Sequence, residues 1–500
     1  MRFIFYAVIC SFISIQFVNA QCIQPTNLQH QVDIPVQFPL LQHNMTAKRD
    51  TAASKPYLYV AGKERGLVIY NISNLTSPVL TASILPSAMQ NLDVMSLTQA
   101  GNYLYLALGD FFNASSEKSG MAIVDISTPS NPVLKSTYSY SLTSGAGHVA
   151  VDGNYAYLSA MQNGIIVFDV SNKSNIQLVS VFKPSIHFPK VNPNTSEQQK
   201  INVRQVTIKN NVLYVCDDAG GVRIVNATNK TNLVETGQYS NPLLNARPRA
   251  YNNLILHDTL VYVAADYCGM EILNVKDTSN ITQVGWWNPW NCQSPSNTWF
   301  NSPGYANEIA YDANCHLVFL STGRSDVHVV NVSNPAAPDS CARYGNTTDS
   351  LGTWGLDRYN NQIYVAYMAT WPLYVPFPST WSGIKILTYN NACSASGINE
   401  LIHDDEVKLY PNPSNGIFSI EIKNLLCPIN VLVYNSIGQI VLKKILTEQK
   451  QKLTDYPYKD EIEIPESYNI DDLYILNISY HNTLLNELAK RFHVVHSIPE

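Results

Sequence analysis

Short β-favouring runs bounded by turn residues recur along most of the sequence. One run, GIIVFDVS at residues 164–171, begins with glycine, continues through apolar residues and ends at Asp followed by a β-branched residue and Ser. Branched and aromatic residues favour strands, whereas Asp, Asn, Ser and Thr side chains cap turns. Related runs lie at residues 66–73, 120–127, 221–228, 269–276, 326–333 and 383–389. The copies predict one repeated unit.

A second run, centred on an aromatic residue, lies about ten residues before each copy. Its central residues are Tyr59, Tyr105, Tyr157, Tyr214, Tyr262, Phe319 and Tyr364. A third run precedes it in most units (HVAV, residues 148–151) and a fourth ends the unit (QLVSVF, residues 177–182). Four short strands in each of seven units of about fifty residues are typical of propeller blades, so the pattern predicts an all-β, seven-bladed β-propeller.

These motifs also resemble a known repeat family. The glycine-started runs, the YxYV-type runs before them and the Asn-Pro-Val at residues 131–133 are similar to the LVIVD repeat of secreted and surface propellers. The resemblance covers roughly residues 45–392. It implies a propeller and supplies no catalytic residues.

The first and last units each need a separate interpretation. In the first unit, we expect the inner strand at residues 51–54. The last unit has no evident fourth strand, because the polar run NNAC follows residue 389. We expect the apolar segment at residues 32–41 (VDIPVQFPLL) to supply that strand, since its prolines suit an outer edge and closing the ring removes an unpaired edge.

The composition changes after Cys393. We expect a linker at residues 399–406, followed by a domain at residues 407–500 that contains YPNPSNG and YNSIGQIV. These motifs resemble the C-terminal sorting domain of the type IX secretion system. The resemblance implies a small β-sandwich, a partnership with the type IX secretion machinery, and a secreted or outer-membrane surface location on a Gram-negative bacterium. The alternative is an ordinary adhesive β-sandwich.

Residues 1–20 are predicted to form a secretory signal peptide, because Arg2 precedes an apolar stretch that ends at Val18-Asn19-Ala20. A retained anchor is the alternative, although the run is short for a membrane span. We therefore expect the propeller domain to occupy residues 21–398, with no transmembrane segment in the mature chain.

Charge and cysteine content narrow the function further. The net charge is -6 and no run of one sign is present, which argues against nucleic-acid binding. No CxxC spacing occurs, so we expect neither a metal site nor a cofactor. An oxidising location permits disulfides. A closed ring would bring Cys22 to Cys393, and Cys268 with Cys292 and Cys315 with Cys341 are further candidate pairs.

Propeller geometry places the start of each inner strand and the loop after each second strand on one face. Residues expected to open the inner strands are Ser96, His148, Gln205, Asn253, Glu308 and Trp354. The loops add Asp110, Asp217, Asp218, Asp266 and Arg324. These side chains can bind a polar ligand over the channel; alternatively, they cap strands and turns and bind channel water.

The aromatic residues are unevenly distributed. All seven tryptophans fall in the last three units: Trp286, Trp287, Trp290, Trp299, Trp354, Trp371 and Trp381. A cluster of such rings is costly to leave exposed. Either the loops pack on one another as a lid, or the rings form a platform that binds a ligand.

No motif of nucleophilic, zinc-protease or phosphate-binding chemistry is present. The sequence therefore favours a secreted or surface binding and adhesion module that recognises a glycan or a protein through its loop face. A polysaccharide hydrolase or lyase using His148, Glu308 and Arg204 is the alternative, and a scaffold in a surface complex is the third possibility.

Overall fold

A computed structural model describes residues 28–36, 43–112, 117–185, 200–245, 247–299, 301–370, 377 and 379–389, together with seven strands between residues 407 and 493. The chain divides into two compact units, residues 1–393 and 394–500. The predicted signal peptide at residues 1–20, the predicted linker at residues 399–406, Cys22 and Cys393 lie outside the described residues.

The first unit contains seven four-stranded antiparallel sheets, which we number as blades 1 to 7. From the inside outwards, blade 1 is β2 (Thr46–Arg49), β3 (Tyr57–Ala61), β4 (Leu67–Asn71) and β5 (Val79–Ile84); blade 2 is β6 (Val94–Ala100), β7 (Tyr103–Leu108), β8 (Lys118–Asp125) and β9 (Val133–Thr143); blade 3 is β10 (His148–Asp152), β11 (Tyr155–Ser159), β12 (Ile165–Asp169) and β13 (Gln177–Phe182); blade 4 is β14 (Gln205–Lys209), β15 (Val212–Cys216), β16 (Val222–Asn226) and β17 (Val234–Tyr239).

The remaining blades follow the same order. Blade 5 is β18 (Asn253–His257), β19 (Leu260–Ala264), β20 (Met270–Asn274) and β21 (Thr282–Trp287); blade 6 is β22 (Ile309–Asp312), β23 (Leu317–Ser321), β24 (Val327–Asn331) and β25 (Asp339–Tyr344); blade 7 is β26 (Thr353–Tyr359), β27 (Gln362–Tyr367), β28 (Gly383–Thr388) and β1 (Gln29–Pro35).

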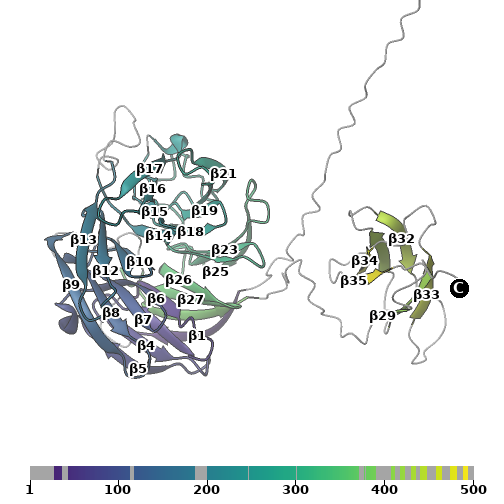
Figure 1. Ribbon diagram of the computed structural model, residues 1–500, viewed down its shortest axis with the longest axis horizontal. Coiled ribbons are helices and arrows are strands. Elements are labelled where there is room, and N and C mark those ends of the chain that lie inside the picture. The colour runs from purple at the N-terminus through teal and green to yellow at the C-terminus, as the bar shows by residue number, and fades with distance from the viewer. Residues whose placement is uncertain are drawn as a thin grey trace, which may run out of the picture. The chain divides into compact units, whose positions relative to one another are not determined.

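The blades close into a ring around a central channel. Each innermost strand contacts the innermost strand of the next blade, and β26 of blade 7 contacts β2 of blade 1. Figure 1 shows β10, β14, β18 and β26 towards the middle of the ring and β5, β9, β13, β17 and β21 on its outside. The predicted all-β, seven-bladed propeller is confirmed.

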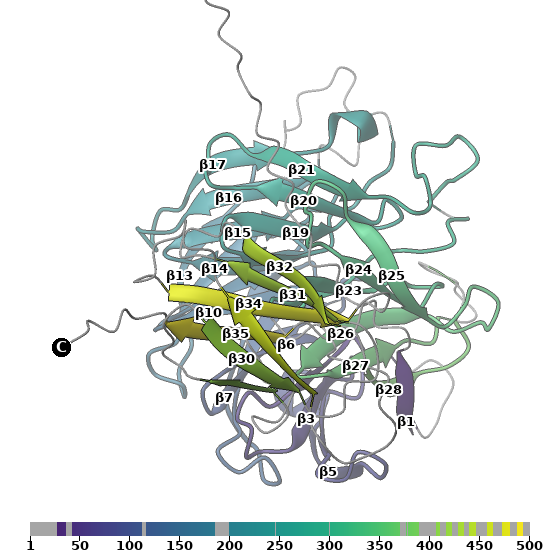
Figure 2. The ribbon, with the colours of Figure 1, turned by 90° about the vertical axis from the view of Figure 1, so that its right-hand side faces the viewer.

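An N-terminal strand completes the last blade. β1 pairs with β28 in an antiparallel register that runs from Gln29–Thr388 to Pro35–Gly383, and Figure 2 shows β1 beside β28 and β27. Lys385 also contacts Asp33 at 2.9 Å across the pair. The expectation that the segment after residue 31 supplies the missing strand is confirmed, although the strand begins earlier, and residues 37–41 lie outside the described residues.

The inner strand of blade 1 is not where the sequence predicted it. Residues 51–54 form a turn, and the strand is β2, before them. The Asp50 carboxylate accepts a hydrogen bond from the Ala52 amide at 2.8 Å, which is the local geometry of a turn.

The repeated glycine has a steric cause. Gly164 has a φ of +79°, and a Cβ there would lie 2.2 Å from the carbonyl oxygen of Phe182 on the outer strand. Gly66, Gly221 and Gly269 have the same surroundings. A residue with a side chain would be strained and would push the outer strand away, so this position favours glycine.

The polar end of the repeat caps a turn in the way the sequence predicted. Asp169 Oδ1 accepts a hydrogen bond from the Ser171 amide at 2.8 Å. The same bond recurs at Asn71, Asp125, Asn226, Asn274 and Asn331. Each such turn connects the third strand of a blade to its fourth.

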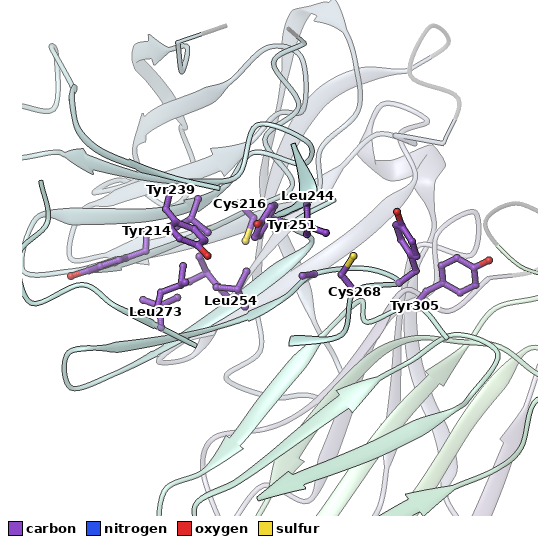
Figure 3. Close-up of a cluster of buried hydrophobic side chains, with 14 of the residues drawn as sticks. Tyr214, Cys216, Tyr239, Leu244, Tyr251, Leu254, Cys268, Leu273 and Tyr305 are labelled. Atoms are coloured by element: carbon purple, nitrogen blue, oxygen red, sulfur yellow. The ribbon is translucent and has the colours of Figure 1, made fainter. Parts of the chain in front are cut away.

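The core lies between neighbouring blades. One cluster joins Tyr214 and Tyr239 of blade 4 to Leu254 and Leu273 of blade 5, and Figure 3 shows these side chains together. Apolar side chains from both faces of a blade are thereby removed from water, which stabilises the ring by about 25 cal/mol for each Å² buried.

The second unit contains two antiparallel sheets. In the three-stranded sheet, β30 (Ile417–Ile422) lies between β29 (Val407–Tyr410) and β33 (Tyr458–Glu463). The four-stranded sheet has the order β32 (Ile440–Leu446), β31 (Ile429–Tyr434), β34 (Leu473–Tyr480) and β35 (Leu488–His493). Within the part of the chain that the structure describes, no helix reaches the length and apolar character of a membrane span.

Candidate binding pocket at the mouth of the central channel

A pocket opens at the end of the channel where the inner strands begin. Six of its lining residues hold one position in six consecutive blades, just before or at the start of the inner strand: Met95, Gly147, Arg204, Asn252, Asn307 and Trp354. The next residue along contributes in three blades, as His148, Asn253 and Glu308, and Phe111 enters from the loop after β7. The cavity volume is about 30 Å³, which gives room for roughly two water molecules.

Backbone bridges between blades position these residues. In five blades, the loop after the second strand pairs with the residue that immediately precedes a lining residue of the next blade: Lys63 with Val94, Met161 with Val203, Asp218 with Tyr251, Asp266 with Ala306, and Gly323 with Thr353. Side chains that vary from blade to blade are therefore presented by a repeated backbone geometry.

Arg204 lies at this pocket with its hydrogen-bonding groups unused. The guanidinium carbon lies 4.8 Å from the centre of the Phe111 ring and 5.8 Å from that of Trp354. Among the described residues, the Arg204 side chain forms neither a hydrogen bond nor an ion pair within 4.0 Å. Aromatic faces thus hold the side chain in place and leave its five N–H donors available.

Two asparagines continue the wall of the pocket. Asn252 Nδ2 donates to the Ala306 carbonyl at 3.0 Å, and Asn307 Nδ2 donates to the Thr353 carbonyl at 3.3 Å. Asn252 Oδ1 is buried and has no hydrogen-bond partner in the described part of the chain. An unsatisfied buried acceptor is costly, so this oxygen is suited to a donor that a ligand or a water molecule brings.

His148 is held as a neutral imidazole. Its Nδ1 lies 3.1 Å from the Val206 carbonyl oxygen, so Nδ1 carries the proton and Nε2 is an acceptor. Burial, followed by the charge of Lys48, lowers the pKa of His148 to about 3. The side chain therefore does not titrate near neutral pH.

Glu308 of blade 6 is held by hydrogen bonds from blades 1 and 7. Its Oε2 accepts from Thr46 Oγ1 and from the Leu356 amide, each at 2.8 Å. Burial raises the pKa of this carboxyl to about 7, against the opposing effect of Lys48. No hydrogen bond joins Glu308 to His148 within the described residues, so the acid–base pair considered from the sequence is not connected in this structure.

The predicted ring of polar residues divides into two groups. His148, Asn253, Glu308 and Trp354 line the pocket. Gln205 is buried beside it and donates to Thr207 Oγ1 at 2.9 Å, and the Ser96 side chain is also buried. Gln205 and Ser96 are therefore buried behind the residues that line the pocket.

The acidic side chains of the loops are bonded to other side chains of the same chain. Asp110 pairs with Lys63 at 3.0 Å, and Asp217 lies 3.4 Å from Arg223. Asp218 accepts a hydrogen bond from Asn202 Nδ2. Asp266 accepts a hydrogen bond from Trp299 Nε1 at 2.7 Å. Arg324 is half-buried in the turn after β23.

The tryptophans do not gather into one open platform. Trp287 and Trp290 pack together with His328 of blade 6. Trp286 donates its indole N–H to the Cys268 carbonyl at 2.9 Å, and Trp381 packs on Tyr367 of blade 7. Of the predicted set, Trp354 reaches the pocket and Trp371 lies outside the described residues. This arrangement favours the interpretation that the tryptophans pack the loops against the protein, rather than forming a platform that binds a ligand.

A disulfide fixes the tryptophan-bearing loop that follows blade 5. Cys268 and Cys292 are joined with Cα atoms 5.1 Å apart. The other candidate pair is wrong: Cys315 and Cys341 contact the same core, but no disulfide joins them. Cys341 lies on β25, two strands away from the hairpin that holds Cys315, and strands about 4.8 Å apart put the pair beyond disulfide reach.

Sequence reasoning missed several members of the pocket. Four lining residues each lie one residue before a residue predicted to open an inner strand: Asn252, Asn307, Met95 and Gly147. A prediction shifted by one residue would have included them. Phe111 comes from a loop, where repeat register gives no prediction.

Comparison with known families agrees with this architecture. The LVIVD repeat matches residues 48–85, 93–139, 145–183 and 202–241, which correspond to blades 1 to 4. The secretion system C-terminal sorting domain matches residues 408–456. The chain carries LVIVD repeats and a C-terminal sorting domain. The sorting domain makes the LVIVD-repeat propeller a secreted or outer-membrane surface protein and implies the type IX secretion machinery as a partner.

Solved structures match the chain at low sequence identity. A chain of the mitotic checkpoint complex matches the LVIVD-repeat chain with a TM-score of 0.50 and 9% identity, covering 73% of this chain and 92% of that one. The WD40 β-propeller domain of Doa1 matches with a TM-score of 0.49 and 8% identity, covering 74% and 100%. No curated protein matches the sequence.

Proposed function

We propose that this propeller is a secreted or surface-displayed binding module that takes a polar group of a glycan or protein ligand into the pocket at the channel mouth. The observation that carries the proposal is the unused hydrogen-bonding capacity there. Arg204 offers its donors and Asn252 offers an acceptor, although both are fixed in place by neighbouring residues.

The rigidity of the pocket supports binding. The backbone bridges and the contacts between Phe111, Phe112 and Trp354 order the side chains before any ligand arrives, which reduces the entropy that association would otherwise cost. The rim also offers an apolar contact, because Phe112 packs on Trp354 with ring centres 5.0 Å apart and is 38% exposed. Such a combination of a few placed polar groups and aromatic rings is typical of ligand sites.

One observation favours an enzyme as the second candidate. The raised pKa of Glu308, at about 7, is a property of general acids. Its Oε2 is nevertheless occupied by Thr46 and Leu356, and the neighbouring His148 is neutral and bonded to a carbonyl. The arrangement therefore supports binding better than proton transfer.

The test is a binding screen of the full chain against glycans and peptides, with Arg204→Ala and Trp354→Ala as pocket variants. Arg343→Ala is the matched control, because Arg343 is exposed on the outer strand β25. Binding that is lost in the pocket variants and kept in the control supports the proposal. Absence of binding by the unaltered chain contradicts it, and polysaccharide turnover that disappears in Glu308→Gln supports the enzyme instead.

A further inference from the structure

We infer that the pocket receives the carboxylate of an acidic sugar residue, with Arg204 as its partner and the sugar ring held at the rim. This inference rests on the proposed binding function and names the chemical class of the ligand.

The charge and geometry of Arg204 point to a carboxylate. A guanidinium is planar and presents two parallel N–H groups that match the two oxygens of a carboxylate. The guanidinium lies over the Phe111 and Trp354 rings, which are not hydrogen-bond acceptors for its edge, and no hydrogen bond from its N–H groups is present among the described residues. Arg204 has no ion pair within 4.0 Å among the residues that the structure describes, so at the mouth of the pocket its charge can attract an incoming anion.

Three buried carboxyl groups near the pocket form no ion pair with Arg204 within 4.0 Å in the described part of the chain, although the charge of Arg204 acts on Asp218 and Asp266. Asp218 is bonded to Asn202, Asp266 to Trp299, and Glu308 to Thr46. Burial raises the pKa of each of them, so near neutral pH they repel a ligand anion less than three full charges would. Lys48 adds a positive charge that acts on two lining residues, His148 and Glu308.

The size of the cavity decides how much of the ligand enters. A space of about 30 Å³ holds roughly two water molecules, so a carboxylate group fits and a pyranose ring does not. The ring must then remain outside, where the partly exposed Phe112 provides an apolar face.

A buried acceptor favours a sugar over other carboxylates. Because Asn252 Nδ2 is committed to the Ala306 carbonyl, Oδ1 is fixed as an acceptor without a partner. His148 Nε2 is a second acceptor in the same pocket. An acidic sugar carries hydroxyl donors on the ring that bears its carboxylate. From the opening these hydroxyls can donate to the acceptors directly or through a water molecule inside the pocket, whereas an Asp or Glu side chain has no hydroxyl donor.

The experiment is isothermal titration of the full chain with methyl glycosides and oligomers of glucuronic and galacturonic acid, and with the neutral glucose and galactose counterparts. We expect the uronides to bind and the neutral sugars to bind at least about tenfold more weakly, because a charge-assisted hydrogen bond is lost. Arg204→Gln should reduce uronide affinity about 10- to 100-fold. Arg204→Lys should restore only part of it, because the bidentate geometry is lost.

Arg343→Gln serves as the control and should leave affinity unchanged. Equal affinity for uronides and neutral sugars, unchanged affinity in Arg204→Gln, or Arg204-dependent binding of an acidic peptide in place of uronides would each overturn the inference. Arg204-dependent binding of neutral glycans or peptides would leave the proposed binding function standing. Absence of binding to every probe would contradict both.

Discussion

Blades 1 to 4 and blades 5 to 7 have the same architecture and differ in what their side chains do. The first four blades match the LVIVD repeat. The last three contain all seven tryptophans and the Cys268–Cys292 disulfide. The regular blades therefore show what the fold requires, and the diverged blades show what can change once the backbone bridges keep the ring in place.

Blade 6 shows how far a blade can diverge. Asp326, with a φ of +55°, takes the place of the repeated glycine. Its side chain fits because Gly345 follows the outer strand, where an added Cβ would lie 1.7 Å from Asp326 Oδ2. In blade 6 the glycine therefore follows the fourth strand instead of preceding the third, and the turn before the third strand keeps its left-handed conformation.

The largest expected effect comes from breaking a regular blade at its glycine. Gly164→Ala should lower the free energy of unfolding by roughly 3 kcal/mol or more, because the new Cβ would meet the Phe182 carbonyl at 2.2 Å and the backbone would be left-handed. The measurement is unfolding in denaturant. Gly153→Ala is the matched control: its φ is also positive, but nothing lies within 4 Å, so it should cost only about 1 kcal/mol. Equal costs would show that the clash does not matter.

A smaller loss should follow when the loop of blade 5 is released. Cys292→Ser opens a covalent link between residues 24 apart in sequence, and loop-closure entropy gives about 3 kcal/mol for such a link. We expect a lower midpoint of thermal unfolding and a change in tryptophan fluorescence. Cys341→Ser, which breaks no disulfide, is the comparison. An unchanged midpoint in Cys292→Ser would mean that this loop does not contribute to the stability of the diverged blades.

The smallest expected effect concerns Asp326, which occupies the position that is glycine in the regular blades. Burial, and then the nearby Asp349, raises the pKa of Asp326 to about 7. Because the folded-state pKa exceeds the unfolded value, this group makes the protein less stable as the pH rises from about 4 to 7. Asp326→Asn should therefore stabilise the chain by about 1–3 kcal/mol at pH 8 and have little effect at pH 4. Asp339→Asn, at an exposed position on the outer strand β25, is the control for removing a carboxylate from this blade. Stabilisation of Asp326→Asn that is equal at both pH values would contradict this account.

The regular blades could be predicted well from the sequence, because each strand and turn repeats at a fixed register. That register also located His148, Asn253, Glu308 and Trp354 at the pocket, and the apolar segment near residue 32 was matched to the open blade. Spacing alone could not show that Asn252 faces the channel, since a one-residue shift changes which side chain reaches the opening.

The diverged blades could be predicted less well. Sequence placed the tryptophans in particular loops, but the direction of each ring depends on partners distant in sequence, such as Asp266 for Trp299 and Ser340 for Trp287. The pairing of Cys315 with Cys341 failed for the same reason, because the order of strands within blade 6 separates two residues that the sequence places close together.

The pairing of β1 with β28 also determines when the ring can close. Gln29 pairs with Thr388, so folding cannot finish until nearly all of the propeller has been synthesised. Contacts between residues so far apart in sequence also slow folding. During that time the edge of blade 7 is open to any strand with the right pattern. An identical β1 from another molecule would satisfy the same hydrogen bonds, which makes strand exchange between two copies the natural misfolding route of this architecture.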